Sequence, residues 1–163
     1  EASEAAPAAP GRGYRFYSGE SVVFPFGHGL SYAGFEYEWH DKCAGTSGSG
    51  SGCVAEKLQG VSLVLNVLVT NSGAVSGGSF HGVAADTVLL FLVPPKDAGH
   101  MGAPLKVPRG LEKVSVGPAL TEEVAFKLTD EDFSLVNSKG VSSLVKGEWT
   151  VQVGELRKPV LIQ

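Results

Sequence analysis

An alternation of apolar and polar residues along much of the chain is the sequence feature that most limits the fold. Residues 35–40 read Phe-Glu-Tyr-Glu-Trp-His, and apolar side chains occupy every second position from Val61 to Val69. Successive side chains of a β-strand point to opposite faces, so this period of two predicts strands with one buried face. No segment shows the period of 3.6 residues that an amphipathic helix requires.

Further segments show strand patterns, and turns separate them. They cover residues 87–93, 111–116, 124–128, 149–153 and 159–162. The first of these segments is apolar on both faces, which predicts a central strand or a strand under a covering segment. Turn-forming residues lie between strands, as in Asn71-Ser72-Gly73. About seven short strands joined by turns predict an all-β sandwich.

The length and composition are those of one globular domain. With 163 residues, the chain is long enough for one core and too short for two domains of ordinary size. The net charge is -4 and the basic residues are scattered singly, which argues against nucleic acid as a partner. No apolar run reaches the roughly 20 residues of a membrane-spanning helix. Because the sequence begins Glu-Ala-Ser, without Met or an apolar leader, we interpret it as a processed chain or a fragment.

Two cysteines, Cys43 and Cys53, flank a stretch rich in glycine and serine. Their spacing does not fit a CxxC redox or zinc pair, and no second pair supplies further ligands. We predict a disulfide that closes this loop and contributes about 3 kcal/mol, with two unpaired thiols as the alternative. A disulfide implies an oxidising compartment, so we expect an extracellular or secreted protein. We interpret the stretch itself as a flexible hairpin tip, whose hydroxyl groups are candidate sites for O-linked sugar.

The first 32 residues differ from the rest of the chain. Residues 1–10 are small, acidic and contain proline, which is typical of an extended arm. Residues 11–32 hold many aromatic and aliphatic side chains between glycines, and Pro25 argues against a helix. We therefore divide the chain into an extended N-terminal arm with an aromatic segment, residues 1–32, and a β-sandwich, residues 33–163.

Several motifs resemble those of one known domain. GRGYRFYSGE, from Gly11, followed by VVFPFGHGLSYAGFEY, from Val22, resembles the linker into the C-terminal fibronectin type III-like domain of family 3 glycoside hydrolases. VLVTNSG, DTVLLFLVPP and GEWTVQVG resemble a turn and two strands of that domain, and the β-xylosidase branch is the most similar. The resemblance covers about residues 11–158. It implies an immunoglobulin- or fibronectin type III-like β-sandwich.

The chain also departs from the family that it resembles. The family commonly has an aromatic residue where Leu111 stands, and a Pro-Gly-Glu turn where this chain has Gly117-Pro118-Ala119. In the family, domains that carry an aspartate nucleophile and a general acid precede this domain, whereas ten residues precede the resembling stretch here. The resemblance therefore implies a module without catalytic machinery of its own.

The acidic residues and histidines give no pattern of a catalytic or metal site. Glycoside cleavage needs two carboxyl groups roughly 5–9.5 Å apart across the scissile bond. We interpret the paired acidic residues as solvated surface charge: Glu36 with Glu38, Glu122 with Glu123, and Asp130-Glu131-Asp132. The histidines have neither HxH nor HxxxH spacing: His28, His40, His81 and His100. We expect no enzyme activity, no cofactor and no metal.

The aromatic segment suggests self-assembly. Five or six open rings of about 150–250 Å² each would expose on the order of 1,000 Å², more than the usual largest patch of a monomer. We predict that the arm packs on a neighbouring copy and that repetition of this contact builds a filament. The side chains predicted to make the contact are Tyr14, Phe16, Tyr17, Val22, Val23, Phe24 and Phe26.

Two other functions are alternatives to self-assembly. The chain would be an accessory domain of a family 3 β-glucosidase or β-xylosidase if its aromatic segment packed on the enzyme. It would be a carbohydrate-binding module if exposed aromatic rings formed a platform, but Trp39 and Trp149 fall on the apolar faces of their strands. The expected partners are further copies of the chain, with glycans as a second class, and neither nucleic acid nor a membrane.

Overall fold

The structure is a computed structural model, and it describes most of the chain. The described residues are 13–17, 22–44, 53–55, 62–75, 78–79, 81–101, 103–137 and 139–163. Only the backbone is described for residues 41–44, 53–55, 74–75, 78–79 and 99–101.

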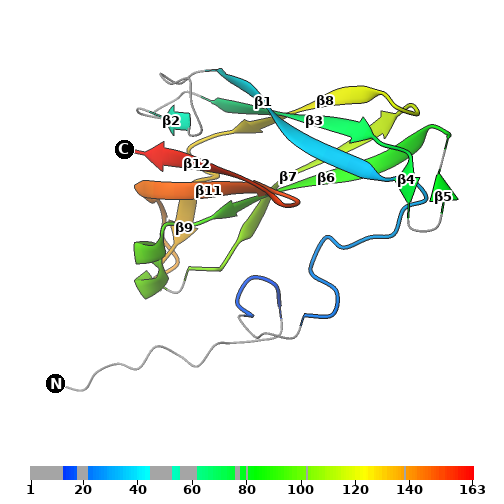
Figure 1. The fold of residues 1–163 in the computed structure, drawn as a ribbon. Coiled ribbons are helices and arrows are strands. Elements are labelled where there is room, and N and C mark those ends of the chain that lie inside the picture. Colours follow the sequence, from blue (N-terminus) through cyan, green and yellow to red (C-terminus); the bar gives the residue numbers. More distant parts are fainter. Residues whose placement is uncertain are drawn as a thin grey trace.

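Two packed sheets form a β-sandwich (Figure 1). The first sheet has the strand order β1-β3-β8, with strands Phe35–Ala44, Leu63–Asn71 and Thr121–Leu128. The second sheet has the order β2-β12-β11-β6-β7, with strands Cys53–Ala55, Leu156–Ile162, Gly147–Val153, Ala84–Val93 and Val107–Val116. The other described elements are two small hairpins and a 3-10 helix: β4 (Ala74–Val75) with β5 (Gly78–Ser79), β9 (Ser134–Val136) with β10 (Ser142–Leu144), and η1 (Lys96–Met101).

The predicted all-β sandwich is confirmed. The seven long strands coincide with the segments in which strand patterns were found, although the alternation begins at Val61 and β3 begins at Leu63. Every second residue of β3, from Leu63 to Asn71, is buried, and β8, β11 and β12 alternate in the same way. The buried faces of the two sheets meet in one hydrophobic core. The period of two therefore marks the core-facing positions, because each sheet has one face on the core and one face outside it.

Two aromatic side chains lie at the centre of this core. Trp149 and Phe133 are fully buried, and their rings meet edge to face with centroids 5.5 Å apart. The indole Nε1 of Trp149 donates a hydrogen bond to the carbonyl oxygen of Val145 over 2.9 Å. Gly110 allows the second sheet to approach closely, because a Cβ atom there would collide with the ring of Phe126.

Asn71 joins the two sheets at the end of β3. Its buried side-chain amide donates to the carbonyl oxygens of Gly82 over 3.2 Å and Val116 over 3.1 Å. Its Oδ1 accepts a hydrogen bond from the backbone N–H of Gly73 over 3.1 Å. A buried amide requires partners of this kind. The residue that signals a turn in the sequence therefore also fastens β7 to the first sheet.

The region around the two cysteines differs from the expected hairpin. β1 pairs with β3, whereas β2 pairs in parallel with β12. The strands on either side of the glycine- and serine-rich stretch thus belong to different sheets, and the hairpin interpretation is wrong. β1 and β2 do not pair with each other, because each pairs with a strand later in the chain, β3 and β12 respectively. The side chains of Cys43 and Cys53 lie outside the described part, so the disulfide stays a prediction.

Candidate functional site

The aromatic segment lies on the outer face of the second sheet, beneath β6 in Figure 1. Phe91 points outward from β6 and is nevertheless only 5% exposed. The rings of Tyr14 and Phe26 stack with centroids 4.0 Å apart, and both contact Phe91 edge-on at 6.3 and 5.9 Å. The ammonium group of Lys106 lies 4.5 Å from the centre of the Phe91 ring. The prediction that this strand is central or covered is confirmed, because β6 lies between β11 and β7 under these rings.

Backbone hydrogen bonds hold this covering segment in place. The amides of Phe16 and Tyr17 both donate to the carbonyl oxygen of Gly13 over 3.0 Å, which forms a turn. The carbonyl oxygen of Arg15 accepts a hydrogen bond from the amide of Leu105 over 2.6 Å. Residues 13–17 are therefore attached to the connection that precedes β7.

Gly27 brings the second part of the segment close to the sheet. Its φ is 89°, in the left-handed region that favours glycine, and a Cβ atom there would lie 2.9 Å from a methyl carbon of Leu89. The adjacent turn is closed by a hydrogen bond from the amide of His28 to the carbonyl oxygen of Pro25 over 2.9 Å. Residues 25–28 thus follow the outer face of β6.

Part of the segment is open to solvent. Large apolar side chains are exposed there: Val22, Val23, Phe24, Leu30 and Tyr32. Val23 is 82% exposed and Leu30 is 97% exposed, and residues 22–34 contain no Lys, Arg, Asp or Glu. We call the five exposed side chains the apolar ridge. A concentration of exposed apolar groups without charge is typical of a contact surface.

The seven side chains predicted to mediate assembly divide between two environments. Tyr14 and Phe26 contact Phe91 of their own sandwich, and Phe16 is partly buried. Tyr17 is exposed, and the other three belong to the apolar ridge: Val22, Val23 and Phe24. The structure thus brings the whole set to one face of the molecule, with part of it already used within the chain.

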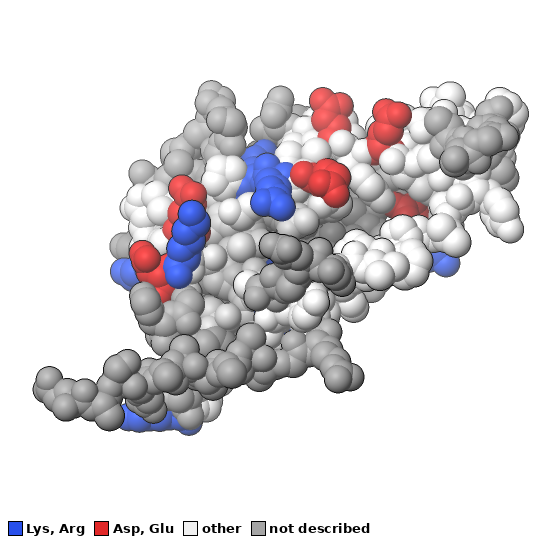
Figure 2. Space-filling view, turned by 60° about the horizontal axis from the view of Figure 1, so that its bottom comes forward, with Lys and Arg blue, Asp and Glu red and all other residues white. Residues whose placement is uncertain are grey.

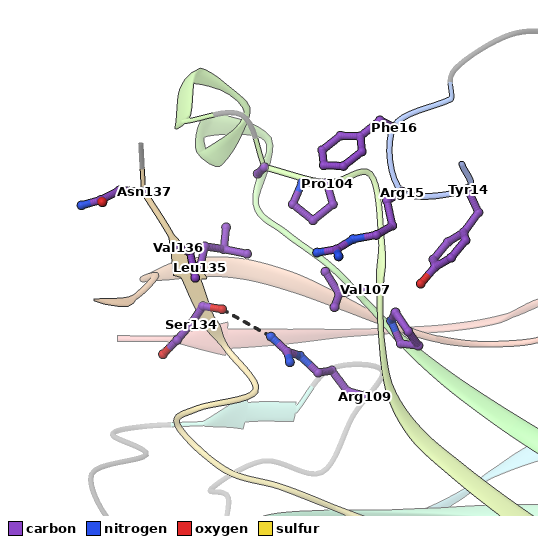
Figure 3. A pocket seen from close by; sticks show the side chains of 12 residues that line it. Tyr14, Arg15, Phe16, Pro104, Val107, Arg109, Ser134, Leu135, Val136 and Asn137 are labelled. Carbon is purple, nitrogen blue, oxygen red and sulfur yellow. Dashed lines mark hydrogen bonds between the residues drawn. The ribbon is translucent and has the colours of Figure 1, made fainter. Parts of the chain in front are cut away.

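A cavity of about 500 Å³ opens beside this segment (Figure 3). Its walls come from residues 14–16, from residues between 103 and 109, and from residues 134–137. Figure 3 shows the side chain of Arg15 extending into the space and that of Arg109 reaching toward Ser134. Sequence reasoning missed this cavity, because its walls come from three distant segments and no motif marks them.

The two guanidinium groups at the cavity differ in how they are held. Arg109 donates from Nε to the carbonyl oxygen of Asp132 over 3.1 Å and from Nη2 to that of Ser134 over 3.4 Å. The guanidinium carbon of Arg15 lies 5.9 Å from the centre of the Phe16 ring. Among the described residues, neither arginine forms an ion pair. The described residues that line the cavity include no Asp or Glu, so the charged side chains among them are the two arginines.

Most of the carboxylates considered in the sequence lie at the surface of the sandwich. Glu36, Glu38 and Glu122 are exposed, and Glu123 Oε1 lies within hydrogen-bond distance of His40 Nδ1, at 3.0 Å. Asp132 Oδ2 accepts hydrogen bonds from the amide and hydroxyl of Thr129 over 2.7 and 3.1 Å, which closes a turn. These positions agree with the interpretation as surface charge. Asp130 differs, because its Oδ1 is buried and has no hydrogen-bond partner among the described residues.

Acidic and basic residues are mixed on the face shown in Figure 2, where no basic stripe is present among the described residues. In the same part of the chain, no group of three His, Cys, Asp or Glu side chains is placed to hold a metal ion. No described helix has the length and apolar character to cross a membrane.

Tyr37 carries the clearest electrostatic perturbation. Its hydroxyl donates a short hydrogen bond to Asp86 Oδ2, which links β1 of one sheet to β6 of the other. Burial, then this hydrogen bond, then the charge of Asp86 raise the pKa of the Tyr37 phenol far above its usual value. Tyr37 is therefore held as a neutral hydrogen-bond donor, which suits a structural role.

Comparison with known proteins defines the class to which this fold belongs. Residues 86–156 match the family model described as a fibronectin type III-like domain. The chain resembles the crystal structure of the GH3 β-glucosidase from Bifidobacterium adolescentis with a TM-score of 0.65 and 27% identity. That similarity covers 87% of this chain and 19% of the other. The chain thus contains a fibronectin type III-like β-sandwich domain.

Relatives make the assignment more specific. The β-xylosidase/α-L-arabinofuranosidase 2 of Medicago sativa subsp. varia is 30% identical over 167 residues, which cover 94% of this chain and 20% of that protein. Exo-1,4-β-xylosidase bxlB of Emericella nidulans is 32% identical over 145 residues, which cover 88% and 18%. The chain spans about a fifth of the length of these relatives. As the motifs predicted, its domain is the fibronectin type III-like domain of family 3 glycoside hydrolases.

Proposed function

We propose that this accessory domain docks on the catalytic part of a family 3 glycosidase through the apolar ridge. The observation that carries the proposal is the uncharged segment 22–34, part of which packs on β6 while part exposes large apolar groups. Covering such groups stabilises a complex by roughly 25 cal/mol per Å² of apolar surface removed from water. Interface cores are depleted in charge and rich in aromatic residues, as this segment is.

The anchoring of the segment supports this proposal. Docking costs less when the contacting side chains are already held in place, because less conformational entropy is lost. Here Tyr14, Phe26 and Phe91 hold the segment on its own sandwich, and Gly27 allows it to follow the sheet closely. The apolar ridge is thus part of a segment that is packed on its own sandwich. Docking of the domain would stabilise the catalytic part of the enzyme.

A chimera tests the docking. This chain replaces the corresponding region of the Medicago β-xylosidase/α-L-arabinofuranosidase, to which it is 30% identical. We expect the double variant Phe24→Ser, Leu30→Ser to lower the melting temperature of the catalytic part and to separate one unfolding transition into two. The control variant Val141→Ser changes an apolar residue that is 56% exposed in the β9–β10 loop, and it should leave the transition unchanged. Equal melting curves for the double variant and the control would refute docking through the ridge.

Self-assembly is the second candidate function. The same exposed side chains would serve a neighbouring copy as well as a catalytic domain, and Tyr17, Val22, Val23, Phe24 and Phe26 are each at least 40% exposed. Against it stand the contacts of Tyr14 and Phe26 with Phe91, which would break if the arm left its own sandwich. Sugar binding by the tryptophans has less support, because Trp149 is fully buried and Trp39 packs against the core.

We also propose that the domain works outside the cell, where Cys43 and Cys53 form a disulfide. The proposal is supported by the spacing of the cysteines and by their positions on β1 and β2, at edges of the two sheets. Alkylation without reduction should leave both cysteines unlabelled, and alkylation after reduction should label both. Labelling of the folded, unreduced protein would contradict the disulfide and remove this argument for an oxidising compartment.

A further inference from the structure

We propose that the cavity of about 500 Å³ beside residues 14–16 binds the carboxylate group of an acidic sugar residue, such as a uronic acid in an oligosaccharide. The two arginines that line the cavity, Arg15 and Arg109, point to the carboxylate. The choice of a sugar rests on the proposed function, since the relatives of the chain are named as β-xylosidases and β-glucosidases.

The arginines provide the donors that a carboxylate needs. A guanidinium group has five N–H donors in a fixed plane, of which two can meet both oxygens of one carboxylate. Arg109 uses Nε and one position on Nη2 for the carbonyl oxygens of Asp132 and Ser134, so further N–H groups remain for a ligand. Those two bonds also fix the plane of the guanidinium beside β9 (Figure 3).

The missing counter-ion is the second argument. The protein has a net charge of -4, yet Arg15 and Arg109 face one cavity, and neither forms an ion pair among the described residues. Arg109 contacts the carbonyl oxygen of Asp132 and not its carboxylate. That carboxylate accepts hydrogen bonds from Thr129. Because both guanidinium groups line this cavity, an anion bound there would be attracted by both charges.

The remaining walls suit a sugar ring. Tyr14, Phe16, Pro104 and Val107 provide aromatic and apolar surface, against which the C–H groups of a pyranose can pack. A volume of about 500 Å³ lies within the range of small-molecule sites, which combine apolar walls with a few polar groups. The hollow shape favours a compact ligand over a flat protein surface.

Calorimetric titration of the chain tests the site. The probes are a xylo-oligosaccharide that carries one glucuronic acid, the neutral oligosaccharide of equal length, and acetate. We expect the acidic oligosaccharide to bind at least about tenfold more tightly than the neutral one, as a charged hydrogen-bonded contact implies. Acetate should bind more weakly than the acidic oligosaccharide. Equal affinity for the acidic and neutral sugars, no binding of either, or acetate binding as tightly as the acidic sugar would each overturn the proposal.

Variants connect the affinity to the cavity. Arg15→Gln removes one charge from an exposed side chain and should weaken binding of the acidic oligosaccharide at least about fivefold. Arg109→Lys keeps a charge but loses the planar fork, and it should also weaken binding. Arg157→Gln, an exposed arginine on β12, is the matched control and should bind as the unchanged chain does. Unchanged affinity of the Arg15 variant for the acidic oligosaccharide would refute the carboxylate site. The arginine variants leave the apolar ridge unchanged, so their outcome is independent of the docking test with the chimera.

Discussion

The two tryptophans of the domain have the same ring and opposite polar environments. Trp149 donates a hydrogen bond from Nε1 to Val145, whereas the buried Nε1 of Trp39 has no hydrogen-bond partner among the described residues. Trp149→Phe removes volume from the core and leaves a carbonyl oxygen without its donor, so it should cost about 2–4 kcal/mol. Trp39→Phe removes an unsatisfied donor and should cost less than about 1 kcal/mol. Urea unfolding of both variants would show equal losses if the hydrogen bond contributed nothing.

Ala119 has a backbone conformation that does not suit its side chain. Its φ is 55°, and the amide of Leu120 donates to the carbonyl oxygen of Gly117 over 3.1 Å, so Ala119 occupies the third position of a tight turn. Glycine adopts this left-handed conformation without strain. Ala119→Gly should therefore stabilise the domain by about 0.5–1 kcal/mol. Ala125→Gly, in the exposed face of β8, is the control and should destabilise it by a similar amount. Destabilisation by both would contradict the strain.

Tyr37 should make stability sensitive to alkaline pH. Its pKa is raised in the folded chain by burial, by the hydrogen bond to Asp86 and by the charge of Asp86, while the unfolded chain keeps the usual value near 10. Above pH 10 the unfolded state releases this proton before the folded state does, so the free energy of unfolding falls as pH rises.

The advantage of the unchanged chain over Tyr37→Phe should therefore shrink above pH 10. Asp86→Asn, which removes the charge and leaves an acceptor, should show a shallower decline than the unchanged chain. Denaturant unfolding from pH 8 to pH 12 measures both effects. A constant difference between the unchanged chain and the phenylalanine variant over that range would show that Tyr37 titrates equally in the two states.

Among the elements, the N-terminal segment depends on one strand residue. Phe91 is the contact shared by Tyr14 and Phe26, so Phe91→Ala should release the segment and cost about 3 kcal/mol. The amide of Leu105, bonded to the carbonyl oxygen of Arg15, reports release through faster hydrogen exchange. Phe24→Ala is the control, because Phe24 is 71% exposed and its recorded ring contact is with His28. Unchanged protection of Leu105 in the Phe91 variant would mean that other contacts hold the segment.

Element length decides how much of the fold could be predicted from the sequence. Strands such as β3 and β11 are long enough for several alternations, and both were predicted from period alone. The three-residue strands β2, β9 and β10 contain too few positions for any period to emerge. The partner of β2 was also unpredictable, because β12 lies far along the chain.

The candidate site could likewise be predicted only in part from the sequence. Composition alone identified the aromatic segment, because aromatic and aliphatic residues crowd there between glycines. Which of its side chains would face the sheet depends on Phe91, a residue from a distant strand. Arg15 and Arg109 line one cavity only because the fold brings distant segments together. Their spacing in the sequence therefore could not predict the cavity.

At the scale of the whole molecule, the state of association separates the two functions considered for the apolar ridge. Self-assembly in which the arm leaves its own sandwich exposes Phe91 and breaks the contacts of Tyr14 and Phe26. Docking on an enzyme leaves those contacts intact. Because they bury apolar surface within one chain, we expect the isolated chain to remain a monomer of 16.9 kDa at micromolar concentration.

Light scattering on unheated protein measures this mass, and the double variant Phe24→Ser, Leu30→Ser tests the origin of any larger species. A monomer in both samples agrees with an apolar ridge that contacts a catalytic domain and not another copy of the chain. Large, open-ended particles that vanish in the double variant would contradict our expectation and support assembly of copies, since a contact between unlike surfaces propagates without closing. Particles that persist in the double variant would exclude Phe24 and Leu30 as the assembling contact and direct attention to the edge strands β1 and β7.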